Sequence, residues 1–492
     1  MQLKYPNRQK IFIPIVLLSF ILLANSCKKF VQIPPPNTEI VSASVFNNSN
    51  TVTSALTAIY SGMYNNGESY NIADNQGFLA DELTNYSTQQ AQLQFYTNSL
   101  SALDDNGQWV NGYNYIYQAN NLIEGLQNNA NISPAIAQQI TGEAKFIRAF
   151  WHFYLTIEYG AIPFVTTTDY KINQALARTP QPDVYTQIIT DLNDAASLLS
   201  NNYVDESDTT TSTDRIRPNK GAAEALLARA YLYAGKYDSA KIEATNVIAN
   251  GQYQLCTDLS LLMNPNSTNF VFMANSTEAI WQLGIPQPQG VSNTADATNF
   301  ILTASPNNYG NINCSTISTQ LFNAFDSGDQ RKTNWIGVYT TSNPTVNYYF
   351  PYKYQSYNTN TITEYTMVLR LAEQYLIRAE AEANLGDIAG ATNDLNVIRA
   401  RAGLPPSSIL TASSSLQQAD SAILHERQVE LFTEWGHRWF DLNRTGAVTT
   451  VMGPPGNVCH TKGGTWNSDW QLYPLSHSEI GYDKNLSQNP GY

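Results

Sequence analysis

Apolar and charged residues alternate most regularly between residues 425 and 444. At helical spacing, apolar side chains recur on one side of this segment and charged side chains on the other. The apolar set is Leu424, Leu431, Trp435, Trp439 and Leu442, and the charged set is Glu426, Glu430, Glu434, Arg438 and Asp441. The pattern predicts one amphipathic helix with an unusually acidic polar face.

This acidic face needs cations from another part of the chain. Glutamates four residues apart on a helix repel each other by about 0.2–0.5 kcal/mol per pair unless cations lie against them. Arg378, Arg399 and Arg401 stand shortly upstream, on two further predicted helices. We therefore expect the charged set to form a structural ion-pair network that joins two parts of the fold, and we favour this role over catalysis.

Other segments carry apolar stripes at three- and four-residue spacing, which is typical of helices packed on a core. The stripe is clearest over residues 140–155, and it ends where Gly160 and Pro163 stop a helix. We also interpret residues 51–64 and the aromatic-rich residues 108–126 as helices.

Residues 230–240 and 381–391 repeat one another. Each segment reads as a helix, a turn at Gly235 or Gly386, and a second helix that begins with small residues. This is the hairpin of tetratricopeptide-type repeats. Weaker similarity earlier in the chain suggests four such helix pairs.

Residues 250–365 differ in composition from the rest of the chain: they are rich in Asn, Ser, Thr, Gly, Pro and Tyr, and they show no helical periodicity. We expect loops, short strands and small helices there. Residues 278–283 are the clearest strand, with Trp281 in the core, whereas residues 348–350 alternate ambiguously. Residues 445–492 are expected to be loop-like.

The N-terminus resembles a secretion signal. Residues 1–10 are basic, residues 11–23 are apolar but too short to cross a bilayer, and small residues precede Cys27. This arrangement resembles a bacterial lipobox, so we expect cleavage after residue 26 and acylation of Cys27; the alternatives are an ordinary signal peptide and a membrane anchor. Residues 27–40, stiffened by prolines, would then form a lipid-anchored tether.

Composition narrows the choice of partners. The net charge of -13 disfavours nucleic acid or anionic lipid, and only 14% of residues are charged while 30 are tyrosines. A surface of this kind suits neutral polar ligands. The four cysteines show no metal-binding spacing.

Several segments together resemble one family. They are residues 78–86 (Phe-Leu-Ala-Asp-Glu-Leu-Thr-Asn-Tyr), 143–149, 159–163, 321–331, 425–444 and 485–492. In these segments the chain is similar to the SusD/RagB family, cell-surface lipoproteins that bind nutrients for an outer-membrane transporter. It departs from the family pattern at Ala161, where an acid is usual, and at residues 473–476, which lack a second proline.

The resemblance implies a mainly α fold, in which tetratricopeptide-like helix pairs form a right-handed superhelical scaffold with a loop-rich insertion carrying short strands. It implies a single domain over residues 41–492, with the scaffold at about 41–250 and 366–444 and the insertion at about 251–365. It also implies localisation at the outer membrane, with display on the outer face, and a SusC-like TonB-dependent transporter as partner.

Catalytic patterns find little support. Asp81 and Glu82 are adjacent, so in an extended strand their carboxylates would point to opposite faces. His425-Glu426 would need a histidine at position 429 for a zinc helix, and that residue is Val429. Cys459-His460 lacks a second ligand pair. We expect no enzymatic activity, cofactor or metal.

Binding is better supported, because sugar rings lie on flat aromatic faces while amides and carboxylates meet their hydroxyls. Two aromatic and polar regions supply candidate ligand-binding residues. These are Tyr70, Tyr86, Phe95 and Tyr96 in the first region, and Phe300 and Tyr309 in the second. Each ring taken singly also suits the core.

The sequence therefore predicts a non-catalytic protein that captures an oligosaccharide and delivers it to the transporter. Two alternatives of the binding class stay open: a tetratricopeptide scaffold for proteins only, and a peptide-binding member of the same family. A surface glycosidase is a third alternative, which would require an acid pair facing a cleft.

Overall fold

The computed structural model describes residues 42–492, except 105–106, 287–292, 307–312, 343, 360 and 408–409. The expected leader, Cys27 and the whole of the expected tether lie outside this part of the chain. Residues Phe46–Tyr492 form one compact unit, and the short helix α2 (Ser42–Val45) belongs to a separate one. No helix among the described residues combines the length and apolar character that a membrane span requires.

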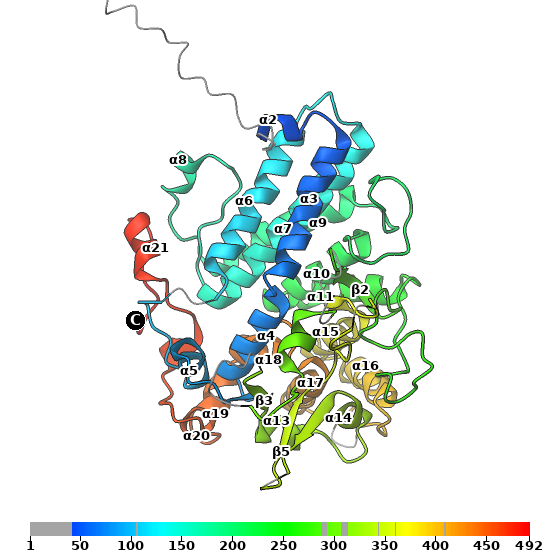
Figure 1. Cartoon of the computed structure of the whole chain (residues 1–492), viewed down its shortest axis with the longest axis vertical. Helices are drawn as coiled ribbons and strands as arrows, with labels where there is room; N and C mark the ends of the chain where they lie inside the picture. The colour runs from blue at the N-terminus through cyan, green and yellow to red at the C-terminus, as the bar shows by residue number, and fades with distance from the viewer. Residues whose placement is uncertain are drawn as a thin grey trace, which may run out of the picture. The chain divides into compact units, whose positions relative to one another are not determined.

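Helices make up most of this unit (Figure 1). The longer helices are α3 (Ser49–Asn65), α4 (Glu68–Leu79), α5 (Gln90–Tyr96), α6 (Trp109–Leu126), α7 (Pro134–Tyr159), α9 (Gln181–Leu198), α10 (Lys220–Tyr233), α11 (Tyr237–Ala249), α15 (Leu371–Asn384), α16 (Ile388–Arg401), α17 (Leu416–Leu431) and α18 (His437–Arg444). The shorter ones are α8 (Tyr170–Asn173), α12 (Ala295–Phe300), α13 (Thr319–Ala324), α14 (Gln330–Asn334), α19 (Val448–Met452), α20 (Val458–Thr461), η1 (Ser468–Gln471) and α21 (His477–Tyr482).

Local signals set the ends of these helices. Ser133 precedes α7, and its hydroxyl accepts a hydrogen bond from the Ile136 amide, while Pro134 occupies the first turn. Asn219 caps α10 in the same way. Ser415 and Gln418 form a reciprocal capping box at the start of α17. Short polar side chains therefore supply the acceptors that the first helical amides need.

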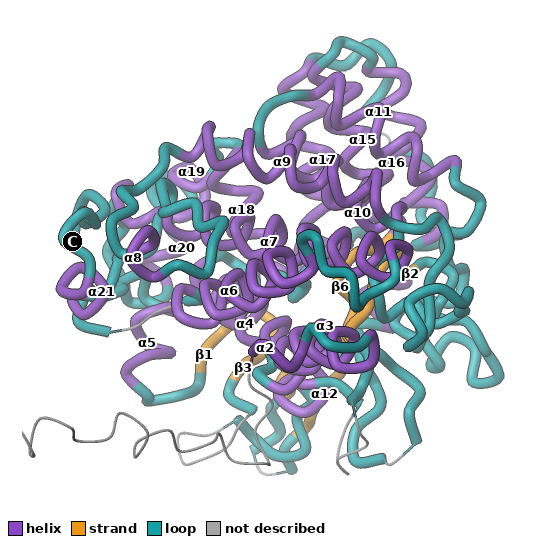
Figure 2. The backbone as a smooth tube through the Cα atoms, turned by 90° about the horizontal axis from the view of Figure 1, so that it is seen from above, coloured by secondary structure: helices purple, strands orange, loops and turns teal. Residues whose placement is uncertain are grey.

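Consecutive long helices pack against one another and build the scaffold. Helix α6 packs on α7, α7 on α9, α9 on α10, α10 on α11, α11 on α15, and α15 on α16. Figure 2 shows the backbone from above, with the strands among helices and loops. The predicted mainly α fold, with tetratricopeptide-like helix pairs, is confirmed.

The two sequence repeats are the pairs α10–α11 and α15–α16. Gly235 and Gly386 turn the chain between the helices of each pair, both with positive φ and both with open space where a side chain would start. Small buried residues, including Ala228, Ala240 and Ala381, let the pairs approach closely. The repeat in the sequence thus corresponds to a repeat in structure.

The segment between the pairs contains short strands, as expected, and one further strand lies earlier in the chain, shortly after α4. The strands are β1 (Leu83–Asn85), β2 (Ala279–Leu283), β3 (Ser315–Ile317), β4 (Ile336–Thr340), β5 (Asn347–Pro351) and β6 (Thr366–Arg370). All pair antiparallel, β1 with β3, β2 with β6 and β4 with β5. The strand predicted around Trp281 is β2.

Aromatic rings occupy the centre of the unit. Trp281 on β2 is fully buried and meets Tyr60, Phe146 and Phe150 edge to face, with ring centroids 5.0–6.0 Å apart. Phe150 in turn packs on Trp435 at 5.3 Å. Strand β2, helix α7 and the segment before α18 therefore share one core.

The sequence pattern predicted one continuous helix over residues 425–444, and this is wrong. Helix α17 ends at Leu431 and α18 begins at His437. Between them Thr433, Trp435 and Gly436 have positive φ, which an α-helix does not allow. The break turns the Trp435 indole so that its Nε1 donates to the Met367 carbonyl at 2.7 Å.

Gly436 offers a test of this break. A Cβ at this position would lie 2.5 Å from Gln76 Cγ and 2.8 Å from Phe440 Cε2, and φ is +74°. We expect Gly436→Ala to lower the free energy of unfolding by about 2–4 kcal/mol, from backbone strain together with overpacking. Urea denaturation followed by circular dichroism measures the loss.

Gly446→Ala is the matched control, because Gly446 has φ +72° but open space around its Cα. It should cost only the backbone strain, roughly 1 kcal/mol. Equal losses in both variants would show that the tight contact beside Gly436 is unimportant.

Candidate functional site

Largely buried carboxylates and cations form a network around α17 and the segment that follows it. Its members are Glu278, Asp329, Glu426, Glu430 and Glu434 with Arg331, Lys353, Arg370, Arg399 and Arg401. Glu430 lies at its centre: Arg370 Nη1 donates to it at 2.5 Å, Arg331 Nη1 donates at 2.8 Å, and Arg401 pairs with it as well. Five carboxylates thus face five cations.

The cations hold Glu430 and Glu434 ionised despite their burial. Burial alone would raise the pKa of Glu430, but Arg401, Arg370 and Arg331 hold it well below its usual value. Arg370 and Lys353 lower the pKa of Glu434 in the same way. A carboxylate that is saturated with cations has no proton to exchange at neutral pH, so the network suits a structural role.

Only two of the three arginines predicted to pair with the glutamates of α17 belong to the network. Arg399 and Arg401 lie against Glu426 and Glu430, but Arg378 instead pairs with Asp394 on α16 at 2.6 Å. Three further cations of the network were not predicted: Arg331, Lys353 and Arg370. They lie far from α17 along the chain, and no local sequence pattern distinguishes them.

The two remaining residues of the charged set, Arg438 and Asp441, are paired outside the Glu430 cluster. Arg438 holds Asp81 with two hydrogen bonds, at 2.7 and 2.8 Å. Asp441 accepts from Arg427 Nε at 2.6 Å and pairs with Arg444 at 2.8 Å. Helix α18 is therefore tied both to the segment after α4 and to α17.

Lys462 fixes the same segment from another direction. Its buried ammonium donates to the carbonyls of Phe78, Leu79 and Ala80, at 2.6, 3.1 and 2.9 Å. These are the last carbonyls of α4, where a cation also meets the negative end of the helix dipole. Burial lowers the pKa of Lys462 to about 7.

Strand β1 leads from this anchored turn to the surface. Leu83 at its start is buried, while Asn85 and Tyr86 are partly exposed. Asn85 Oδ1 accepts from the Ser87 amide at 2.7 Å, which holds the bend that follows the strand. The ion pair of Asp81 and the hydrogen bonds of Lys462 therefore hold residues 78–86 in place, and this fixes the position of Tyr86.

Three tyrosines gather around β1, and we call Tyr86, Tyr96 and Tyr348 the aromatic surface. The rings of Tyr86 and Tyr348 meet edge to face with centroids 5.6 Å apart, and Tyr96 packs on Phe78 at 6.0 Å. All three tyrosines are partly exposed. Tyr348 comes from β5 and joins Tyr86 only through tertiary folding, so sequence spacing could not reveal the pair.

Exposed neutral side chains follow Tyr86 directly: Thr88, Gln89 and Gln90. Amides and hydroxyls of this kind can donate and accept hydrogen bonds without a net charge. Aromatic faces beside them form a surface suited to an uncharged, hydroxyl-rich ligand.

The other predicted ligand-binding aromatics lie elsewhere. Phe95 and Phe300 are 4% and 3% exposed, so neither presents a ring face to solvent. Tyr70 is half-buried and packs on Phe300 at 5.0 Å. Tyr309 lies outside the described residues. The structure therefore brings together Tyr86 and Tyr96 of the predicted set and adds Tyr348.

Among the described residues, no three His, Cys, Asp or Glu side chains come close enough to hold a metal ion. Asp81 is paired with Arg438, and Glu82 is buried, with its Oε2 accepting from the Thr433 amide at 3.4 Å. Neither carboxylate of this pair faces a cleft in the way that a glycosidase requires.

Comparison with known proteins finds SusD-like relatives. A model described as the SusD family matches residues 327–492, and one described as starch-binding, associating with the outer membrane, matches residues 35–232. A SusD-like protein, P2, from Formosa agariphila is 28% identical over 80% of this chain and 83% of its own length.

Solved structures share the fold. A SusD superfamily protein from Bacteroides vulgatus superposes with a TM-score of 0.73 at 20% identity, covering 91% of this chain and 100% of its own. A structure described as a laminarin-binding SusD-like protein superposes with a TM-score of 0.69 at 22% identity, covering 90% and 99%.

Buried carboxyls around α4 make stability depend on pH. Burial, with the Asp81 carboxylate nearby, raises the pKa of Glu82 to about 8, and burial raises that of Glu158 to about 8. An unfolded glutamate titrates near pH 4.3, so between about pH 4.3 and 8 the folded state binds more protons. We expect the free energy of unfolding to fall as pH rises through this window.

The variant Glu82→Gln keeps the neutral form at all pH values, so its loss of stability between about pH 5 and 8 should be smaller than that of the unaltered protein. The exposed Glu206, changed to Gln, is the control and should leave the slope unchanged. Urea denaturation at several pH values measures both. Identical slopes in the two variants would show that Glu82 titrates normally.

Proposed function

Because the chain belongs to the SusD/RagB family, we propose that it is a non-catalytic nutrient-binding protein that captures an oligosaccharide. The observation that carries the proposal is the aromatic surface, which combines partly exposed tyrosine rings with neutral hydrogen-bonding side chains. Relatives named for starch and laminarin support a glycan as the ligand class.

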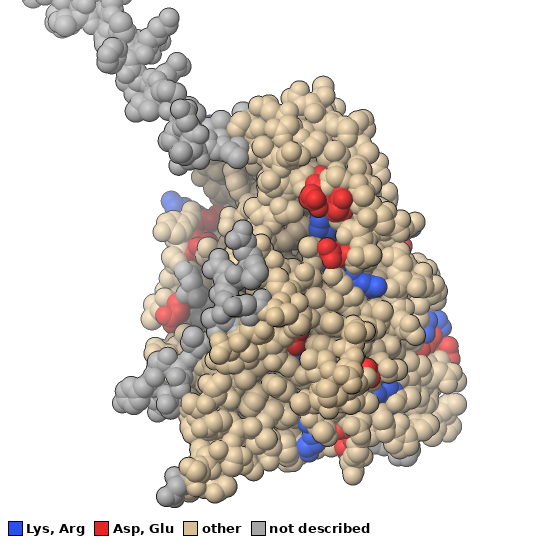
Figure 3. All heavy atoms as spheres, turned by 45° about the vertical axis from the view of Figure 1, so that its right-hand side comes forward, with Lys and Arg blue, Asp and Glu red and all other residues tan. Residues whose placement is uncertain are grey.

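The chemistry of the surface favours a neutral sugar. Sugar rings have apolar C–H faces that lie against aromatic rings, and their hydroxyls pair with amides and hydroxyls. Charged residues are few along the whole chain, and neutral residues cover most of the face shown in Figure 3. A neutral glycan loses little hydration energy on such a surface, whereas an ionic ligand would lose much.

We propose that the captured glycan passes to a SusC-like TonB-dependent transporter in the outer membrane. Acylation of Cys27 after removal of residues 1–26 would anchor the protein there, with residues 27–40 as the tether. The mainly helical unit would then hold the aromatic surface near the transporter, and binding followed by handover needs no chemical turnover.

Removal of the rings at the aromatic surface tests the binding site. We expect Tyr86→Ala and Tyr348→Ala each to weaken glycan binding about tenfold, because each removes one face of the paired rings; tenfold corresponds to about 1.4 kcal/mol. The experiment first finds a ligand by titrating the protein from residue 28 onward with soluble starch, laminarin and a panel of neutral oligosaccharides. Isothermal titration calorimetry then gives the affinities.

Tyr482→Ala is the control, because Tyr482 is 83% exposed and lies on α21, apart from the aromatic surface. It should bind as the unaltered protein does. Full affinity in both Tyr86→Ala and Tyr348→Ala would place the ligand elsewhere, and binding of peptides without any sugar would favour the peptide-binding alternative.

A further inference from the structure

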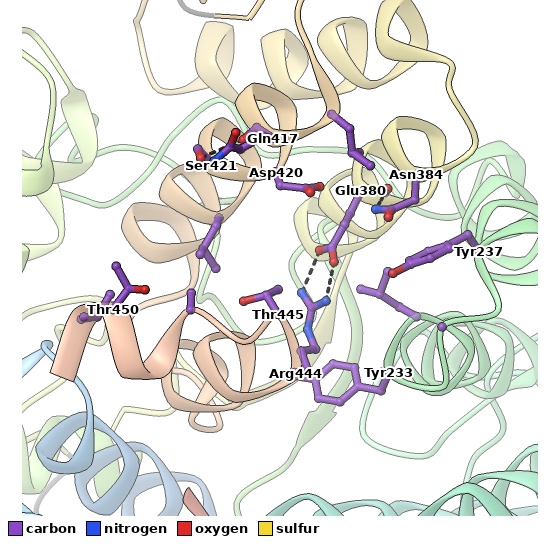
Figure 4. Close-up of a pocket in the computed structure, with 16 residues that line it drawn as sticks. Tyr233, Tyr237, Glu380, Asn384, Gln417, Asp420, Ser421, Arg444, Thr445 and Thr450 are labelled. Atoms are coloured by element: carbon purple, nitrogen blue, oxygen red, sulfur yellow. Dashed lines mark hydrogen bonds and ion pairs between the residues drawn. The ribbon is translucent and has the colours of Figure 1, made fainter. Parts of the chain in front are cut away.

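A second candidate site lies in the helical scaffold, within a cavity of about 690 Å³. Its walls come from the turn between α10 and α11, the end of α15, the first half of α17 and the start of α19, as Figure 4 shows. None of the three tyrosines of the aromatic surface lines this cavity. Its volume is typical of sites for small ligands.

An ion pair between Arg444 and Glu380 forms the floor of the cavity, and the two charges compensate each other. Arg444 holds Glu380 through both guanidinium ends, with Nη2 donating at 2.7 Å. The same guanidinium pairs with Asp441 behind the floor at 2.8 Å and lies over the Tyr233 ring, 5.0 Å from its centroid. Arg444 is therefore already shared between two carboxylates.

Asp420 stands above this floor without a cation. Its side chain points from α17 toward Glu380, as Figure 4 shows, and it makes no ion pair or hydrogen bond with any described residue. Burial and the Glu380 carboxylate raise the pKa of Asp420, while Arg444 opposes them. The charged groups lining the cavity are Glu380, Asp420 and Arg444, so one negative charge is unbalanced.

Aromatic and neutral groups complete the cavity. The hydroxyl of Tyr237 points into it and has no hydrogen-bond partner among the described residues. Neutral polar side chains line the rest of the wall: Asn384, Gln417, Ser421, Thr445 and Thr450. The cavity thus offers a carboxylate, aromatic rings and many uncharged hydrogen-bonding groups.

We propose that this cavity binds a saccharide unit carrying a protonated amine, with the ammonium against Asp420 and the ring against Tyr237. An ammonium group supplies the cation that Asp420 lacks, and it is also attracted to tyrosine faces. The neutral wall residues meet the sugar hydroxyls. A basic peptide would also meet the carboxylate and these groups, and the titrations below distinguish it from the amino sugar.

This proposal goes beyond the proposed function, since it assigns a separate site and another ligand chemistry. The two can be tested apart. Tyr86→Ala should leave binding at the cavity unchanged, and Asp420→Asn should leave binding of neutral glycans unchanged.

The probes are a fully deacetylated glucosamine trisaccharide and its N-acetylated counterpart, titrated by calorimetry at about pH 5.5, where most of the amines are protonated. We expect the deacetylated form to bind at least tenfold more tightly. Asp420→Asn should remove at least tenfold of its affinity, and Asp420→Lys should abolish binding because it places an ammonium beside Glu380 within the protein.

Asp183→Asn is the matched control, because Asp183 is an exposed aspartate on α9 whose side chain makes no hydrogen bond or ion pair with a described residue; it should bind normally. Thermal unfolding shows whether each variant is folded. Equal affinity for the acetylated probe, full affinity in Asp420→Asn, or binding of a lysine-rich peptide but not of the saccharide would each overturn the proposal.

Discussion

The structure depends on a buried network of charges at the centre of the unit. Glu430 accepts from arginines of three different segments, α14, β6 and α16, and thereby ties the loop-rich insertion to the helical scaffold. Burying so many ions is costly in itself, and such networks often stabilise no more than apolar packing would. Breaking one pair, however, leaves an uncompensated charge, at a cost of about 3–5 kcal/mol. The network therefore specifies one arrangement of the segments.

Buried charge pairs also hold the segment that leads to the surface. Asp81 joins the turn after α4 to α18 through Arg438, and Lys462 closes the end of α4. Strand β1 begins two residues after Asp81 and carries Tyr86 to its meeting with Tyr348. A ligand surface held in this way is preorganised, so little of the binding energy is lost in ordering it.

Periodicity and turn signals predicted the regular parts of the fold. The helix pairs around Gly235 and Gly386, the strand around Trp281 and the end of α7 at Gly160 are local features, and each is present. The break between α17 and α18 was missed, since the apolar and charged spacing continues through it. Its cause is tertiary: the segment turns to seat Trp435 in the aromatic core.

Long-range partners could not be predicted. The acidic spacing of Glu426, Glu430 and Glu434 showed that cations were needed, but not that Arg331, Lys353 and Arg370 would supply them. In the same way, Tyr86 could be proposed as a ligand contact, whereas its partner Tyr348 lies far along the chain. Phe95 and Phe300 also lie in segments rich in aromatic and polar residues, as Tyr86 does, yet they are buried in the folded protein.

The most direct test of this account changes Asp81 to Asn and measures two quantities in the same folded protein. These are the amide exchange of strand β1 and the affinity for the neutral glycan found by calorimetry. If buried charge pairing holds the aromatic surface in place, exchange at Leu83–Asn85 will become faster and the glycan will bind more weakly. Unchanged affinity together with faster exchange would contradict the account.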